Sequence, residues 1–217
     1  MKLNNYNNLL ELFFDQYNKQ DKNKIFLTNL GKPQIKISWE KTYLLINHLS
    51  NQISKHIQLG DRCILISENR PEWFITDLAI MLSGGISVPA YTTYTTNDYK
   101  YIINDCEPSI VIVSNDNQFS KIKNILNYKK IKQIISFDRL ENFEFENYIC
   151  MEDIINQKEN FEVFDNEIDL KRSDPACIIY TSGTQGNPKG VMLSHGGILS
   201  NCEGALFLLK EFISKKV

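Results

Sequence analysis

The spacing of apolar side chains predicts helices and strands over most of the chain. Between residues 3 and 17, apolar side chains recur every three or four positions, which predicts an amphipathic helix lying on a core. A longer helix is predicted over 39–57. Between the two, residues 25–28 and 34–38 are strand candidates, joined by the Gly31-Lys32-Pro33 turn signal. This region should cover one side of a core.

After residue 60, short continuous apolar runs alternate with helical patterns. Such runs are typical of strands buried on both faces of a parallel sheet. Residues 138–174 are polar and predict only a connection with a short helix near Asp153. The pattern predicts an α/β fold: a doubly wound, mostly parallel sheet with helices on both faces. Strands are predicted at 63–66, 86–88, 110–113, 133–137, 176–180 and 191–193, and helices at 71–82, 97–104, 118–126 and 197–213.

Composition narrows the class of protein. The chain has 217 residues, of which 42% are hydrophobic, so it can bury a core without disulfides or metals. Its 24 basic and 26 acidic side chains give a net charge of −2, which offers no electrostatic reason to bind nucleic acid. Trp39, Trp73 and the Tyr91 to Tyr101 aromatics are interpreted as core or anchoring residues rather than base-stacking ones.

The cysteines and the apolar runs indicate an intracellular setting. An odd number of widely spaced cysteines excludes a CxxC motif and a disulfide ladder, and reduced thiols suit the cytosol. They are Cys63, Cys106, Cys150, Cys177 and Cys202. His48 and His56 lack a nearby third ligand, which disfavours a metal site there. No apolar run is long enough to span a bilayer. We expect a cytoplasmic protein and leave peripheral contact with the inner face of a membrane open.

The segment from Tyr180 to Gly190 carries the clearest chemistry. It follows an apolar strand and contains three glycines, three hydroxyl side chains and Lys189. Glycines let backbone N–H groups converge on an anion, and the hydroxyls and the lysine add donors. A plain polar hairpin between two strands is the alternative, because Gly, Asn and Pro are common in turns. The combination favours a phosphate-binding loop.

Two common nucleotide-binding motifs do not fit this loop. G-x-x-x-x-G-K-[ST] requires lysine directly after glycine and a helix starting there, whereas here Lys189 precedes Gly190 and a strand pattern follows. The G-x-G-x-x-G fingerprint is absent as well. The loop therefore belongs to another class.

The segment from Ile179 to His195 closely resembles the signature loop of the adenylate-forming (AMP-binding) enzymes, which include acyl-CoA synthetases, luciferases and peptide-synthetase adenylation domains. Its one departure is Gln185, where threonine is more usual. Residues 37–42 and 81–89 resemble two further family motifs in the right order. The resemblance extends from Leu9 onward.

Within that family, residues 68–73 and 88–93 are most similar to long-chain fatty acyl-CoA synthetases. The resemblance implies that a fatty acid reacts with ATP, in the presence of Mg²⁺, to give an acyl-adenylate, and that coenzyme A then displaces AMP. It assigns Lys189 to the β- and γ-phosphates and Thr184 as the candidate contact with Mg²⁺. The implied phosphate-binding set is Thr181, Ser182, Gly183, Thr184, Gln185, Gly186 and Lys189.

The resemblance also implies that residues 1–217 are the N-terminal portion of an adenylation domain. The motifs expected to hold adenine and ribose, and the C-terminal domain with its adenylation lysine, have no counterpart here, so no catalytic residue is assigned. The isolated chain is expected to be inactive in ATP–pyrophosphate exchange. A catalytically inactive nucleotide-binding or interaction module, or an enzyme for another carboxylate, stays open. For His195, a structural role and a place beside the substrate site have equal weight.

Overall fold

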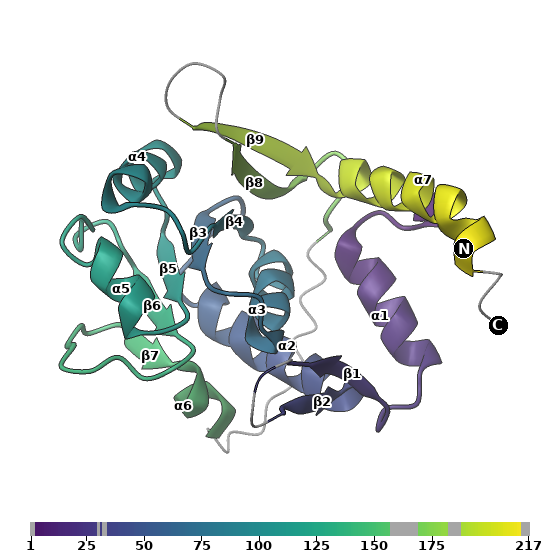
Figure 1. Cartoon of the computed structure of the whole chain (residues 1–217), viewed down its shortest axis with the longest axis horizontal. Helices are drawn as coiled ribbons and strands as arrows, with labels where there is room; N and C mark the ends of the chain where they lie inside the picture. Colours follow the sequence, from purple (N-terminus) through teal and green to yellow (C-terminus); the bar gives the residue numbers. More distant parts are fainter. Residues whose placement is uncertain (1–2, 30, 32–33, 157–168, 182–187, 214–217) are drawn as a thin grey trace.

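A computed structural model describes residues 3–29, 31, 34–156, 169–181 and 188–213 (Figure 1). A small antiparallel sheet stands beside a larger sheet that carries most of the helices. The helices are η1 (Leu3–Asn5, a 3₁₀ turn), α1 (Leu9–Lys19), α2 (Trp39–Ser54), α3 (Pro71–Leu82), α4 (Thr96–Cys106), α5 (Asp116–Ile122), α6 (Met151–Asn156) and α7 (His195–Ile213). The strands are β1 (Ile25–Thr28), β2 (Lys36–Ser38), β3 (Arg62–Ile66), β4 (Ile86–Ala90), β5 (Ile110–Val113), β6 (Gln133–Ser136), β7 (Tyr148–Cys150), β8 (Pro175–Thr181) and β9 (Lys189–Ser194).

The larger sheet has the order β7-β6-β5-β3-β4-β8-β9. All its neighbouring strands are parallel except β8 and β9, which are antiparallel. The chain steps from β3 to β4 on one side and then returns past β3 to β5, so helices cover both faces. The predicted doubly wound, mostly parallel sheet is confirmed.

The central strands show why both faces must be covered. In β3, Cys63 and Leu65 belong to a core shared with α1, α2 and α3, whereas Ile64 and Ile66 belong to a second core shared with α4 and α5. All four side chains are fully buried. Successive side chains of a strand point to opposite faces, so a strand between two helical layers needs apolar residues at every position. This explains the continuous apolar runs of the sequence.

Local signals set several element ends. Ser38 caps α2, and Thr95 with Asp98 forms a complete capping box at the start of α4. At the end of α3, Gly84 has φ 81°, and the N–H of Gly85 reaches the carbonyl of Ile80 at 2.9 Å. That is the helix-ending geometry that glycine favours. The turn delivers the chain directly into β4.

Several predicted elements differ from the structure in their ends. The first predicted helix is two pieces, η1 and α1, because Asn8 caps a new helix. The second helix ends at Ser54 rather than at Ile57, although Ile57 still packs on the core. Likewise α5 ends at Ile122, four residues before the predicted end, while residues 125 and 126 continue to contact the core. Apolar periodicity thus persists beyond the helical backbone.

Strand β7 was missed by the sequence pattern. It has three residues, Tyr148 to Cys150, and pairs with β6 at the edge of the sheet. The short helix expected near Asp153 is present as α6. A three-residue strand in a polar stretch carries too little periodicity to be seen without its partner.

Apolar side chains remain exposed on β9 and α7. They are Val191, Met192, Leu193, Leu206, Phe207, Leu208 and Leu209. Among the cysteines, four are buried and Cys202 is exposed, and all five are free thiols. None of the helices within the described residues combines the length and the apolar character that crossing a membrane requires.

Asp77 of α3 is an acidic group placed unfavourably in this core. Its Oδ1 is buried and has no hydrogen-bond partner among the described residues. Burial raises the pKa of Asp77 to about 6, against a smaller opposing effect of the Ser87 hydroxyl. An acid whose folded pKa lies above its unfolded value of 3.8 binds a proton more tightly in the folded state. Stability is therefore lost as pH rises from about 4 to about 6.

We expect Asp77→Asn to stabilise the chain at neutral and alkaline pH. The gain in the free energy of unfolding should approach about 3 kcal/mol at pH 8 and vanish near pH 3.5, because a neutral amide avoids the cost of burying a charge. Urea unfolding at a series of pH values measures this difference. Glu152→Gln, at an exposed position of α6, is the control and should show no such pH dependence. A gain for Asp77→Asn that is equal at pH 4 and pH 8 would contradict the assignment.

Candidate functional site

The loop identified in the sequence lies between the two strands of the β8–β9 hairpin. The last rung of the ladder pairs Thr181 with Lys189, and both side chains are exposed. Directly paired residues of neighbouring strands place their side chains on the same face of the sheet. The structure therefore brings a hydroxyl and an ammonium group together at the base of the loop. The other predicted phosphate-binding residues, Ser182 to Gly186, lie outside the described residues.

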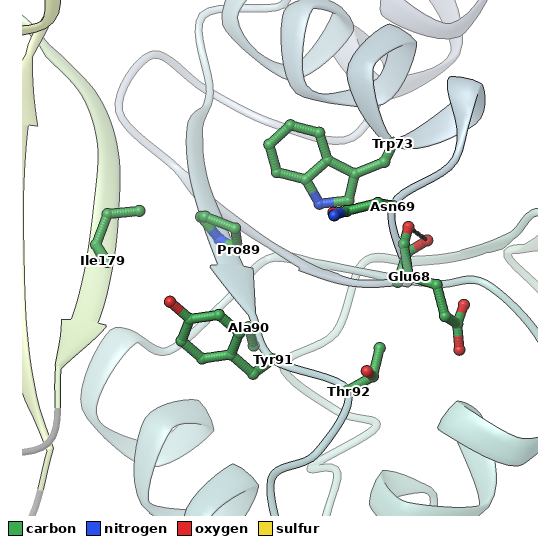
Figure 2. Close-up of a pocket in the computed structure, with 9 residues that line it drawn as sticks. Glu68, Asn69, Trp73, Pro89, Ala90, Tyr91, Thr92 and Ile179 are labelled. Atoms are coloured by element: carbon green, nitrogen blue, oxygen red, sulfur yellow. Dashed lines mark hydrogen bonds between the residues drawn. The ribbon is translucent and has the colours of Figure 1, made fainter. Parts of the chain in front are cut away.

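A pocket of about 520 Å³ lies next to this hairpin, at the carboxyl ends of β3 and β4 (Figure 2). In open α/β sheets, ligands bind at this edge, where strands give way to loops. Ile179 of β8 forms one wall, two residues before Thr181. The pocket and the loop base are thus neighbours on one strand. The lining residues are Ser67, Glu68, Asn69, Trp73, Pro89, Ala90, Tyr91, Thr92 and Ile179.

The two aromatic residues of the pocket differ from what the sequence suggested. Trp73 packs partly on the core, as expected, but also faces the pocket. Tyr91 lies across the pocket from Trp73, and 64% of its surface is exposed. Their sequence positions, shortly after β3 and directly after β4, were the available signal, because residues that follow parallel strands gather at one edge.

Glu68 makes part of the pocket acidic. Gln118 of α5 donates a hydrogen bond from Nε2 to Glu68 Oε1 at 3.0 Å. Partial burial opposes ionisation, yet the polar groups around the carboxylate hold the pKa of Glu68 below its usual range. The side chain therefore carries a negative charge at neutral pH. A negative wall favours an amine or hydroxyl group of a ligand and disfavours a phosphate.

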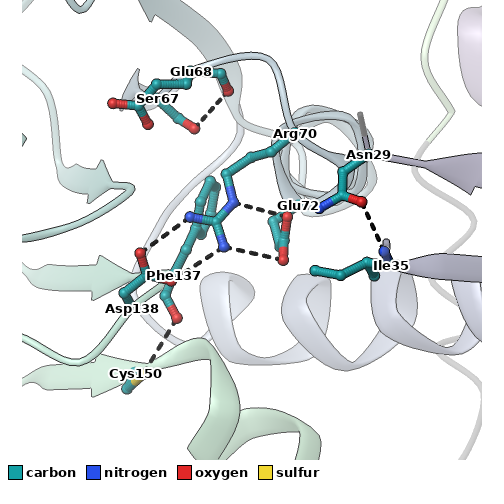
Figure 3. A network of polar contacts seen from close by, with 9 residues as sticks. All are labelled: Asn29, Ile35, Ser67, Glu68, Arg70, Glu72, Phe137, Asp138 and Cys150. Atoms are coloured by element: carbon teal, nitrogen blue, oxygen red, sulfur yellow. Dashed lines mark hydrogen bonds and ion pairs between the residues drawn. The ribbon is translucent and has the colours of Figure 1, made fainter. Parts of the chain in front are cut away.

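Arg70 fixes the loop that carries Glu68 (Figure 3). Its Nε and Nη2 donate to both oxygens of Glu72, at 2.9 and 3.2 Å. Its Nη1 and Nη2 also donate to the two oxygens of Asp138, at 3.2 and 3.1 Å. The guanidinium lies 5.4 Å from the centre of the Phe137 ring. Paired hydrogen bonds between a guanidinium and a carboxylate fix the relative orientation of the two groups. Arg70 therefore joins the end of β3 to the segment after β6.

His195 occupies the first position of α7 and is almost fully buried. The Leu9 N–H donates to its Nδ1 at 3.4 Å, and burial lowers the pKa of His195. A neutral ring is required for Nδ1 to accept this bond. The residue does not line the pocket described above. These contacts tie the start of α7 to the start of α1, while its place relative to a bound substrate stays a prediction.

The residues that follow His195 are explained by packing. A Cβ at Gly196 would lie 2.9 Å from the carbonyl oxygen of Arg172, so only glycine fits there.

Within the described part of the chain, no group of three His, Cys, Asp or Glu side chains is placed to hold a metal ion. The candidate site therefore consists of the loop base and the neighbouring pocket.

Comparison with known proteins identifies the family of this chain. The sequence profile described as "AMP-binding enzyme" matches residues 13–214. Among curated proteins, the Rattus norvegicus long-chain-fatty-acid–CoA ligase ACSBG1 is 29% identical over 201 residues, which are 90% of this chain and 26% of that protein. The chain thus spans about a quarter of the length of this relative.

Solved structures share the fold. An anthranilate CoA ligase, AuaEII, in complex with anthranoyl-AMP superimposes with a TM-score of 0.73 at 22% identity, over 90% of this chain and 36% of that one. A Rhodopseudomonas palustris protein described as a putative long-chain-fatty-acid CoA ligase gives 0.75 at 15% identity, over 94% and 49%. The profile match includes the hairpin, the loop and the pocket, and so confirms the resemblance seen in the sequence. The chain belongs to the AMP-binding enzyme family.

Proposed function

We propose that the protein activates a long-chain fatty acid with ATP and transfers the acyl group to coenzyme A. A carboxylate oxygen attacks the α-phosphorus of ATP, the bond from that phosphorus to the bridging oxygen breaks, and pyrophosphate leaves. The thiol sulfur of coenzyme A then attacks the acyl carbon, AMP leaves, and the thiol proton passes to solvent. The observation that carries the proposal is the Thr181–Lys189 rung at the base of the loop, in a chain of this family.

In this proposal the loop holds the phosphates that leave. Lys189 neutralises the β- and γ-phosphates, and the hydroxyls of Thr181, Ser182 and Thr184 donate hydrogen bonds. Gly183 and Gly186 donate through their backbone N–H groups, and Gln185 adds a polar side chain. Fixed donors aimed at developing charge lower the barrier to phosphoryl chemistry because they need no rearrangement during the reaction. The exposed positions of Thr181 and Lys189 support this assignment.

The pocket suits a different part of a substrate. Its volume of about 520 Å³ lies within the usual range for small-molecule sites. Glu68 would repel a triphosphate, whereas Trp73 and Tyr91 offer apolar surface. We therefore place the phosphates at the loop and an uncharged or amine-bearing portion of a substrate in the pocket, beside Ile179.

Mg²⁺ would accompany ATP and offset its charge. The described residues supply no cluster of three ligating side chains, and Thr184 lies outside them, so no step is assigned to the ion. As to the extent of the chain, we propose that residues 1–217 form the N-terminal portion of an adenylation domain. The relatives named as long-chain-fatty-acid–CoA ligases support the fatty acid as the substrate class.

The phosphate assignment predicts that this chain binds inorganic pyrophosphate through Lys189. Lys189→Ala should weaken binding by about tenfold to a hundredfold, because one charge-assisted hydrogen bond contributes roughly 1.5–3 kcal/mol. Isothermal titration calorimetry measures the affinity. Lys36→Ala, at an exposed lysine of β2, is the matched control and should bind as the wild type does. Equal affinity of the Lys189→Ala variant would refute the assignment.

The substrate class predicts exchange of labelled pyrophosphate into ATP that depends on a long-chain fatty acid. The assay uses the product of the intact gene, with palmitate as the test acid and acetate and benzoate as comparisons. Palmitate should support the fastest exchange. Faster exchange with benzoate would retain adenylation but overturn the fatty acid as substrate. Nucleotide binding without exchange for any acid would favour the inactive nucleotide-binding module.

A further inference from the structure

Within the described sheet, the loop-bearing end of β8 is paired on its β9 side. Its parallel pairing with β4 is registered at Ser87 and Cys177, well before Thr181. Two residues further along β4, Pro89 has no N–H to donate, so the ladder cannot continue in the same way. On the other side, β9 is the edge strand and has no neighbour beyond β8 in the described sheet. Contacts from outside the sheet can therefore add to the β9 pairing in holding this end of β8.

Tyr180 supplies the first additional contact. Its side chain is 3% exposed, and its hydroxyl donates to Asp105 Oδ2 of α4 at 2.5 Å. Burial, and then this hydrogen bond to a carboxylate, raise the pKa of Tyr180, so the hydroxyl keeps its proton at physiological pH. Asp105 itself is exposed, so the buried hydroxyl reaches its carboxylate at the edge of the core. The bond joins the loop-bearing end of β8, in the sheet, to helix α4, in the helical layer.

Tyr94 supplies a second contact, to the backbone. Its hydroxyl donates to the Tyr180 carbonyl at 3.2 Å. The Tyr94 ring lies edge to face against Tyr99, with centroids 6.0 Å apart, and Tyr99 in turn donates to the Tyr91 carbonyl at 2.7 Å. The donor is thus held by its own neighbours. Tyr180 is fixed through its side chain and its main chain, from two directions.

Gly190 makes room for this arrangement. Gly190 of β9 pairs with Tyr180 of β8. A Cβ at Gly190 would lie 3.1 Å from Cζ of the Tyr180 ring and 3.0 Å from Ile178 Cγ2. Such distances are tighter than ordinary contact and would push the ring away. The glycine that follows Lys189 therefore allows the Tyr180 hydroxyl to reach Asp105.

We infer that Asp105 and Tyr94 are positioning residues for the Thr181–Lys189 rung and act through Tyr180. They fix the Tyr180–Gly190 rung, and the next rung carries Thr181 and Lys189. An ammonium group on an edge strand gains affinity for phosphate when its backbone is already in place, because less order has to be imposed on binding. The inference rests on the proposed role of Lys189.

The test compares pyrophosphate affinity among variants of the 217-residue chain by isothermal titration calorimetry. Asp105→Ala, Tyr180→Phe and Tyr94→Phe should each weaken binding by about fivefold, as expected for loss of one hydrogen bond. The Asp105→Ala, Tyr180→Phe double variant should be no weaker than either single variant, because both remove the same bond. Asp105→Asn keeps an acceptor oxygen and should restore affinity to within about twofold of the wild type.

Two controls separate positioning from general stability. Tyr128→Phe removes a tyrosine hydroxyl that donates to a backbone carbonyl, that of Lys123 at 2.8 Å, far from the hairpin in sequence. It should leave pyrophosphate affinity unchanged. Thermal unfolding of each variant confirms folding, and Tyr180→Phe keeps the ring that fills the core. Affinity differences that follow the unfolding temperature, including that of Tyr128→Phe, would overturn the inference.

The outcomes distinguish this inference from the proposed function. If Lys189→Ala loses pyrophosphate binding while Asp105→Ala and Tyr94→Phe bind as the wild type does, the positioning role is wrong and the phosphate loop stands. If the wild-type chain binds no pyrophosphate, the role of Lys189 fails and the positioning role fails with it. Weakened binding in Asp105→Ala, with recovery in Asp105→Asn, supports both.

Discussion

Burial of the central strands on both faces is the constraint on which the rest of this structure depends. Residues 63–66 of β3 and all of β5 lie between two helical layers and are apolar at every position. The candidate site instead lies at the carboxyl edge of the sheet, where β3, β4 and β8 end. Asp77 shows the cost of a departure, since a carboxyl group beneath that sheet has a raised pKa.

Side-chain hydrogen bonds reinforce the ladder at this edge. Arg70 bonds two carboxylates and fixes the segment after β3. On the other side of the pocket, Tyr180 bonds Asp105 and fixes the end of β8. In both cases a hydrogen bond to a carboxylate adds a side-chain contact at the point where a strand becomes a loop. A preorganised edge is what a site for a highly charged substrate needs, because its donors must already be in place.

How far prediction succeeded depended on how local the signal was. Helix α3 and strand β5 have the predicted ends, because Pro71 at the first turn and the run from Ile110 to Val113 are local signals. β7 was missed because three residues show too little periodicity, and the strand is recognised by its pairing with β6. The candidate phosphate loop was proposed from its own residue types. The pocket beside it was not foreseen, because Glu68, Tyr91 and Ile179 come together only when three strands align.

The sequence by itself determined the class of fold, the position of the loop along the chain and the family, because periodicity and a contiguous motif are properties of neighbouring residues. Tertiary structure decided that Trp73 and Tyr91 line one pocket and that Tyr180 bonds Asp105. The residues of each pair lie on or directly after different elements, and their proximity depends on strand order and register. Register is set by the summed packing of both cores, which no local segment encodes.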